Sequence, residues 1–86
     1  MEGSIDQHLG ARLAEARRSS GISLIAAAAA ANMSGPEYTA IETGKTRIPA
    51  IVLARLSRLF GRPVSWFYQG LPGQAVFDKA SRAGSV

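Results

Sequence analysis

The amino-acid sequence predicts a small all-α domain built from five short helices. Three observations lead to this prediction: helix-capping residues and helix-ending glycines alternate along the chain, one segment is nearly pure alanine, and no segment alternates between apolar and polar residues as a strand does. With 86 residues there is room for one compact domain. We place it at residues 1–70 and assign 71–86 to a C-terminal tail, either disordered or forming a short helix, because Leu71-Pro72-Gly73 marks a boundary.

The first two predicted helices are bounded by capping residues. Ser4 and Gln7 have the spacing of a capping box, which we expect to open the first helix, and Gly21 ends it. Ser23 is a favourable N-cap for the second helix, which continues through a run of six alanines, the residue with the highest helix propensity. Asn32 ends this helix, because asparagine tolerates the left-handed backbone conformation better than most residues.

The other three helices follow the same pattern of start and stop residues. Ser34 and Glu37 form a second capping box, and the helix that they open ends at Gly44. The fourth helix carries four residues at helical spacing on one face: Leu53, Leu56, Ser57 and Phe60. Ser65 is expected to cap a last short helix, which Gly70 ends.

Composition and charge narrow the classes of function. The formal net charge is +4 and the sequence pI is about 10.4. The excess lies between residues 5 and 70, where eight basic residues stand against four acidic ones. Such a balance is compatible with a polyanionic partner, and ordinary surface charge is the alternative explanation.

The sequence offers no site for a metal, a cofactor or a small-molecule substrate. It has no cysteine, and its single histidine, His8, gives no zinc site by itself. No glycine-rich loop follows a strand, and no serine or acid has a histidine base placed by a known motif. The N-terminus lacks a secretion signal, and the longest apolar stretch is shorter than the roughly 20 residues of a membrane span. We therefore expect a cytoplasmic protein that is not an enzyme and binds no membrane.

Two of the predicted helices, Ser23–Ala31 and Ser34–Thr43, are separated only by Asn32 and Met33. Two short helices joined by such a tight turn are typical of the helix-turn-helix motif. In that motif the second helix enters the major groove of DNA with its N-terminal residues foremost, while the first helix crosses the DNA backbone. The sequence therefore predicts a domain that binds double-stranded DNA.

Several short motifs resemble, in their order and spacing, those of the Xre-type helix-turn-helix regulators, which include the lambdoid repressors and the Cro proteins. They are Leu9-Gly10-x-Arg12-Leu13-x-x-x-Arg17, Gly21-Ile22-Ser23, Met33-Ser34, Ile41-Glu42-x-Gly44-Lys45, Pro49 and the stretch 56–70. The resemblance covers residues 9–70. It implies a five-helix, lambda repressor-like domain that regulates transcription in a bacterium or a phage.

The resemblance also implies roles for individual residues. Arg17 and Glu42 match a structural ion pair that joins the first and third helices in such folds; an ordinary exposed arginine is the alternative for Arg17. Lys45 and Arg47 lie in the loop where family members contact phosphates, with a merely solvated loop as the alternative. Phosphate contacts are therefore expected at this loop and at two helix starts, whose serines also act as caps: Ser23, Ser34, Lys45 and Arg47.

The positions that family members point into the groove are chemically poor in this chain. They fall on Gly35, Pro36, Glu37, Thr39 and Ala40, with Thr43 as a further candidate. Three of them have no polar side chain, Glu37 is engaged in its capping box, and Thr39 or Ala40 can meet a thymine methyl group. Leu24 also replaces the glutamine that family members place beside the DNA backbone. Direct base readout is therefore expected to be weak, so that binding depends on phosphates and DNA shape.

Apolar residues beyond the needs of a small core indicate an interface. Five residues of the last two helices are expected to form a dimer or partner surface, with completion of the core as the alternative: Ile51, Val52, Leu59, Trp66 and Tyr68. The predicted function is a homodimeric, nucleoid-associated transcription regulator that places residues 34–43 in the major groove, with sequence-specific or shape-dependent binding.

Two other functions are alternatives to this one. The first is a protein-interaction module on the same scaffold, which binds an RNA polymerase subunit, another regulator or a toxin. The second is a membrane-surface or nonspecific polyanion binder. The sequence disfavours it, because no basic helix face opposes large apolar residues.

Overall fold

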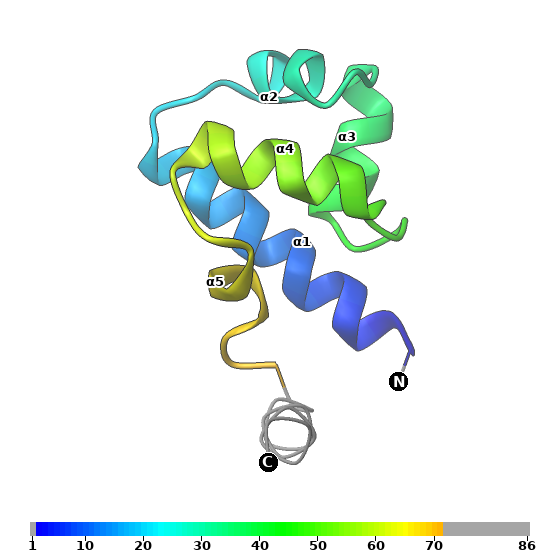
Figure 1. Ribbon diagram of the computed structural model, residues 1–86. Coiled ribbons are helices and arrows are strands. Elements are labelled where there is room, and N and C mark those ends of the chain that lie inside the picture. Colours follow the sequence, from blue (N-terminus) through cyan, green and yellow to red (C-terminus); the bar gives the residue numbers. More distant parts are fainter. Residues whose placement is uncertain (1, 72–86) are drawn as a thin grey trace.

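Five helices make up the part of the chain that this computed structural model describes, residues 2–71: α1 (Glu2–Ser19), α2 (Leu24–Ala30), α3 (Gly35–Glu42), α4 (Ala50–Phe60) and α5 (Val64–Tyr68) (Figure 1). No strand occurs within these residues, so the all-α prediction is confirmed. The tail predicted for residues 71–86 lies, apart from Leu71, outside the described residues.

α1 is the central element of the fold. It runs beneath α2, α3 and α4 in the view of Figure 1 and packs against α3, α4 and α5, while α2 packs against α3 and α4. The largest fully buried side chains come from every helix except α2: Leu13, Tyr38, Ile41, Leu56 and Phe67. α2 instead buries Ala27 and Ala28, small residues that let its backbone lie close to its neighbours.

The predicted caps of α2 and α3 are confirmed. The Ser23 hydroxyl accepts a hydrogen bond from the backbone N–H of Ala26 at 3.1 Å. At the start of α3 the two halves of the capping box are both present, because Ser34 Oγ accepts from the Glu37 N–H at 3.2 Å and Glu37 Oε1 accepts from the Ser34 N–H at 2.9 Å. Asn32 ends the turn before α3 with a left-handed φ of 60°.

Two other predicted helix starts are wrong. α1 begins at Glu2, so Ser4 lies inside the helix and its predicted capping box with Gln7 does not open it. α5 begins at Val64, because Pro63 takes the N-cap position with an extended backbone, and Ser65 is therefore a helical residue rather than the cap.

The C-terminal end of α3 lies unusually close to α1. A Cβ atom on Gly10 would collide with the carbonyl oxygen of Ile41 and lie 2.6 Å from that of Glu42. Just beyond, Gly44 has a left-handed φ of 79°, and a Cβ there would lie 2.6 Å from Cγ of Gln7. Only glycine at these two positions allows α3 and its following loop to rest directly on α1.

Candidate nucleic-acid interface

A partly buried ion pair fixes α3 to α1. The structure brings the predicted partners together: Arg17 Nε donates to Glu42 Oε2 at 2.7 Å, and Arg17 Nη2 donates to Glu42 Oε1 at 3.2 Å. The third nitrogen, Nη1, donates to the carbonyl oxygen of Ile22 at 3.1 Å. The two side chains are only 13% and 7% exposed, and the hydrogen bond to Glu42 raises the pKa of Arg17. One guanidinium therefore links α1, the loop before α2 and α3.

α3 buries one side and presents the other to solvent. Tyr38 and Ile41 point into the core and are fully buried. The predicted groove residues lie on the outward side, where Pro36, Glu37 and Thr43 are exposed and Gly35, Thr39 and Ala40 are half-buried. The structure thus brings the predicted groove residues onto one accessible surface of α3.

Most of the polar groups on this surface are already used within the protein. One carboxylate oxygen of Glu37 accepts the Ser34 N–H in the capping box. The hydroxyl of Thr43 donates back into the helix, to the carbonyl oxygens of Thr39 at 2.9 Å and Ala40 at 3.3 Å. The outward side of α3 therefore offers little hydrogen-bonding capacity for base edges, as the sequence predicts.

The loop between α3 and α4 supplies two cations. Lys45 and Arg47 are exposed, and neither side chain has a hydrogen-bond or ion-pair partner among residues 2–71. Ser23 and Ser34, the two other predicted phosphate contacts, are exposed at the starts of α2 and α3, with their hydroxyls engaged in capping. These four residues lie at the ends of the helix-turn-helix elements, where unpaired N–H groups and cations favour phosphate oxygens.

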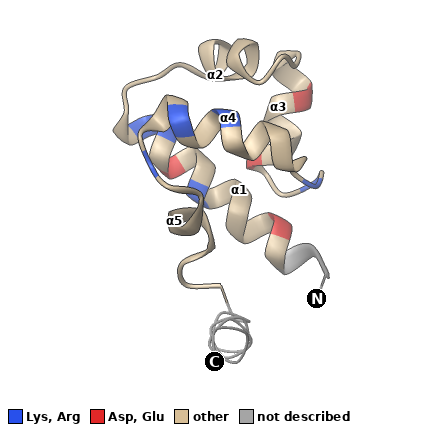
Figure 2. Cartoon of the chain, in the orientation of Figure 1, with Lys and Arg blue, Asp and Glu red and all other residues tan. Residues whose placement is uncertain are grey.

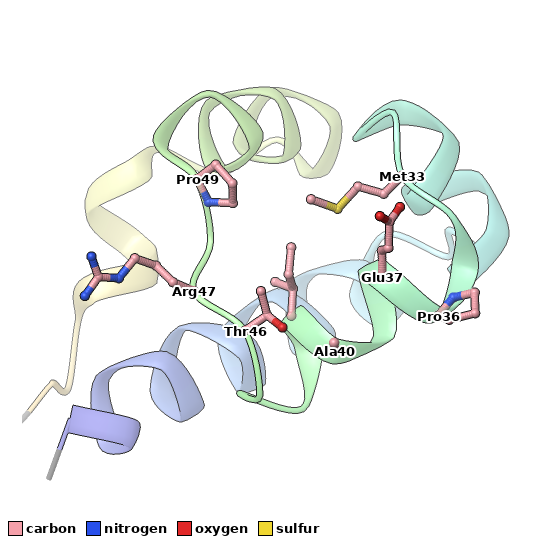
Figure 3. A pocket seen from close by; sticks show the side chains of 8 residues that line it. Met33, Pro36, Glu37, Ala40, Thr46, Arg47 and Pro49 are labelled. Atoms are coloured by element: carbon pink, nitrogen blue, oxygen red, sulfur yellow. The ribbon is translucent and has the colours of Figure 1, made fainter.

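An open hollow of about 470 Å³ lies between α3, the following loop and the start of α4 (Figure 3). Met33 and Pro49 face each other across it, while Arg47 points away from its centre (Figure 3). Its wall is mostly apolar: Met33, Pro36, Glu37, Ala40, Ile41, Thr46, Arg47 and Pro49. No sequence pattern assigns Met33 or Pro49 to a site, because the hollow exists only once the loop folds back beside α3.

The positive charge of the domain is not concentrated at the helix-turn-helix. α2 carries no charged residue, and both charged residues of α3, Glu37 and Glu42, are acidic. Most arginines instead lie on α1, on α4 and in the loops (Figure 2). The excess positive charge that the sequence shows therefore contributes to this surface mainly through Lys45 and Arg47.

The predicted interface residues of α4 and α5 differ in their exposure: three are exposed, Val52 is buried, and Trp66 is half-buried. Ile51, Leu59 and Tyr68 are exposed, at 61%, 40% and 40%. Val52 belongs to the core, at 5% exposure, so its assignment to an interface is wrong. Its spacing explains this, because positions 52, 56 and 60 fall on the same buried face of α4.

Trp66 is half-buried and serves mainly to hold α5 on α1. The guanidinium carbon of Arg12 lies 3.6 Å from the centroid of the indole ring, and that of Arg62 lies 4.3 Å from it. Arg12 Nη2 also donates to the backbone carbonyl of Trp66 at 2.7 Å. The predicted partner surface is therefore reduced to the exposed residues Ile51, Leu59 and Tyr68, together with Val64, which is 40% exposed and was not predicted.

His8 makes a hydrogen bond that connects two helical segments. Its Nε2 lies 2.8 Å from the carbonyl oxygen of Gln69, to which it donates, so the side chain links α1 to the end of α5. Among residues 2–71, no group of three or more histidine, cysteine or acidic side chains could hold a metal ion. None of the helices in the same range combines the length and the apolar character needed to cross a membrane.

The crystal structure of the clp gene regulator ClgR from Corynebacterium glutamicum superposes with a TM-score of 0.68 at 25% sequence identity, covering 73% of this chain and 82% of that chain. A second crystal structure of the same regulator gives a TM-score of 0.74 at 22% identity, covering 94% of this chain and 86% of that one. No curated protein matches the sequence.

The helix-turn-helix domain family matches residues 8–65, which is more than half of the chain and contains the α2-turn-α3 unit. This fold is a DNA-binding architecture and not an enzymatic one. The chain therefore belongs to the helix-turn-helix domain family.

Proposed function

We propose that this protein is a DNA-binding transcription regulator of the Xre/Cro type, which acts on the nucleoid in the cytoplasm and inserts α3 into the major groove. The observation that carries the proposal is the presentation of α3: its outward side is accessible, its inner side is fixed by the Arg17–Glu42 pair, and two unpaired cations follow it. A helix held rigidly beside phosphate-binding groups is what groove insertion requires. The similarity to ClgR, which is described as a gene regulator, supports the same class of function.

Phosphate contacts dominate the proposed binding. Lys45 and Arg47 approach the backbone on one side of α3, and the N-terminal ends of α2 and α3, at Ser23 and Ser34, approach it on the other. Because the polar groups of α3 are few, the domain relies on these contacts and on the shape of the duplex for affinity. A homodimer formed through Ile51 and Leu59 would present two α3 helices to a two-fold-symmetric site.

The test compares two double variants that remove the same charge from different places. Lys45→Ala/Arg47→Ala is expected to weaken binding to every duplex and to reduce the slope of log affinity against log salt concentration by about two, since two phosphate contacts are lost. Arg55→Ala/Arg58→Ala removes two exposed arginines of α4 and is expected to leave most of the slope intact. Equal effects of the two double variants would contradict the assignment of the loop, and no binding of wild-type protein at low salt would contradict the function.

A protein-interaction module is the second candidate function. It is favoured by the exposed apolar residues Ile51 and Leu59, which lie eight positions apart on the outer face of α4. The partner in this case would be an RNA polymerase subunit or another regulator. An apolar contact of this kind responds little to salt, whereas DNA binding weakens steeply, so the same salt series distinguishes the two functions.

A further inference from the structure

The outward side of α3 is more suited to apolar contact than to hydrogen bonding. Pro36 and Ala40 reach this surface with only carbon atoms, and Gly35 offers no side chain. The Thr43 hydroxyl is bonded to the helix backbone, and Glu37 has one oxygen in its capping box. The free polar groups that remain are the hydroxyl of half-buried Thr39 and the second oxygen of Glu37.

The apolar surface continues beside α3 into the 470 Å³ hollow. Pro36 and Ala40 form its wall on the helix, and Met33 and Pro49 close it on the other sides (Figure 3). Pro36 and Ala40 are four residues apart and therefore lie on the same side of the helix, and Met33 lines the same hollow. We call Pro36, Ala40 and Met33 the methyl-facing patch.

One apolar group is available to such a patch in the major groove. The C5-methyl group of thymine is the only carbon substituent that ordinary base pairs expose there, and alanine and threonine side chains contact it without any hydrogen bond. A methylated cytosine carries the same group at the same position. Both bases therefore present the chemistry that the patch fits.

We propose that α3 selects its DNA sites by contact of the methyl-facing patch with C5-methyl groups of pyrimidines in the major groove. This inference rests on the proposed function, since it requires α3 to lie in the groove. Selection by methyl groups gives the domain sequence preference despite its shortage of free hydrogen-bonding groups. The phosphates bound by Lys45 and Arg47 then supply affinity without sequence information.

The experiment changes the DNA and leaves the protein intact. Wild-type protein selects duplexes from a random-sequence library, and the enriched duplexes are made again with thymine replaced by uracil at one position at a time. Loss of a contacted methyl group is expected to weaken binding about fourfold, with an unchanged salt dependence. In a parallel set, 5-methylcytosine paired with guanine replaces a thymine–adenine pair, or 5-methylcytosine replaces an unmethylated cytosine. These duplexes show whether a methyl group on cytosine restores or increases the affinity.

A pair of protein variants assigns the effect to α3. Ala40→Gly removes the contacting methyl group of the patch, and Ala29→Gly makes the same change at an exposed position of α2. The thymine-to-uracil affinity ratio is expected to fall towards one in Ala40→Gly and to remain about fourfold in Ala29→Gly. Circular dichroism establishes that both variants keep their helices.

The outcomes separate the inference from the function on which it rests. If no duplex is enriched or bound in dilute buffer, the proposed function is overturned and this inference with it. If duplexes are bound but every uracil and 5-methylcytosine replacement leaves the affinity unchanged, this inference alone is overturned. Enrichment of cytosines whose recognition needs the free oxygen of Glu37 and no methyl group would overturn it as well.

Discussion

Arg17 makes the most informative single set of contacts in the domain. Its three guanidinium nitrogens donate hydrogen bonds to two acceptor groups, the Glu42 carboxylate and the Ile22 carbonyl, in a site that is almost closed to solvent. The pairing of Arg17 with Glu42 was predictable only from the resemblance to known regulators, since the residues are 25 positions apart. The contact with Ile22 had no sequence signal, because it is made to a backbone atom.

Glu42→Gln tests the strength of this pair. The substitution keeps the shape of the side chain but leaves the Arg17 charge without its counterion, so we expect a loss of about 3 kcal/mol in the free energy of unfolding. Thermal unfolding followed by circular dichroism measures it, and the midpoint should fall by more than about 10 °C. Glu15→Gln is the control, because Glu15 is paired with Arg12 at 3.6 Å on the surface and should change stability by less than about 1 kcal/mol. Equal midpoints for the two variants would contradict a clamping role.

Tyr38 gives the domain an alkaline limit of stability. The ring is fully buried, its hydroxyl has no hydrogen-bond partner among residues 2–71, and burial, followed by the neighbouring Glu42, raises the pKa of Tyr38 above its ordinary value of 10.0. The folded state accepts only the protonated phenol of Tyr38. The stability that depends on this protonated form is therefore fully present below pH 10.0 and is lost as the pH rises above it.

Absorbance of the tyrosinate ion in a Tyr68→Phe variant checks this expectation, since Tyr38 is then the only tyrosine. Ionisation of Tyr38 should coincide with loss of the helical circular dichroism signal. Ionisation of Tyr38 with the ordinary tyrosine pKa of 10.0, while the helices stay intact, would contradict this expectation.

At the scale of the helices, the sequence predicts local features better than contacts between elements. The caps at Ser23 and Ser34 are correct because they depend on residues three positions away. The predicted start of α5 is two residues too late, because Pro63 rather than Ser65 takes the N-cap position. The interface assignment of Val52 is wrong although its four-residue spacing to Leu56 and Phe60 places it on the same buried face of α4.

The crossing of α1 and α3 could not be predicted from helix propensity. Glycine in the middle of a helix is unfavourable by about 1 kcal/mol relative to alanine, so local rules alone would favour alanine at position 10. The backbone of Ile41 and Glu42 occupies the space that an alanine side chain would need. The requirement for glycine is therefore a property of the packed helix pair.

Gly10→Ala is expected to destabilise the domain by about 2 kcal/mol, because backbone atoms cannot move aside as a flexible side chain does. Gly35→Ala is the matched control in the first turn of α3, where a Cβ would meet nothing within 4 Å. Denaturant unfolding should show a lower midpoint for the first variant and an unchanged or slightly higher one for the second. A more stable Gly10→Ala variant would mean that the two helices do not cross this closely.

At the scale of the whole molecule, most of the positive charge lies away from the helix-turn-helix surface. The helix-turn-helix surface has few charges, while α4 carries two arginines (Figure 2). The exposed apolar residues Ile51 and Leu59 lie on the same helix. The net charge of +4 follows directly from the sequence. The distribution of the charged residues over the surface depends on the fold, which decides which helices share a face. DNA contact by the helix-turn-helix surface therefore depends on the two cations of the following loop, Lys45 and Arg47.

Assembly through α4 predicts a specific change in mass. Ile51→Gln/Leu59→Gln removes the apolar groups from the outer face of α4 without adding charge, and we expect a dimeric wild-type protein to become monomeric. Sedimentation velocity measures the change. Ile25→Gln alters an even more exposed residue, at 77%, on α2 and should leave the dimer intact. A monomeric wild-type protein, or dissociation by the α2 variant, would contradict dimerisation through α4.

The central claim is that α3 and the loop after it meet the DNA. Chemical-shift mapping of isotope-labelled protein against an enriched duplex locates the contact directly. We predict that amide signals of residues 34–43, with Lys45 and Arg47, shift on addition of DNA, while those on the outer face of α4 around Arg55 and Leu59 do not. Shifts confined to α4, with α3 unaffected, would contradict the account.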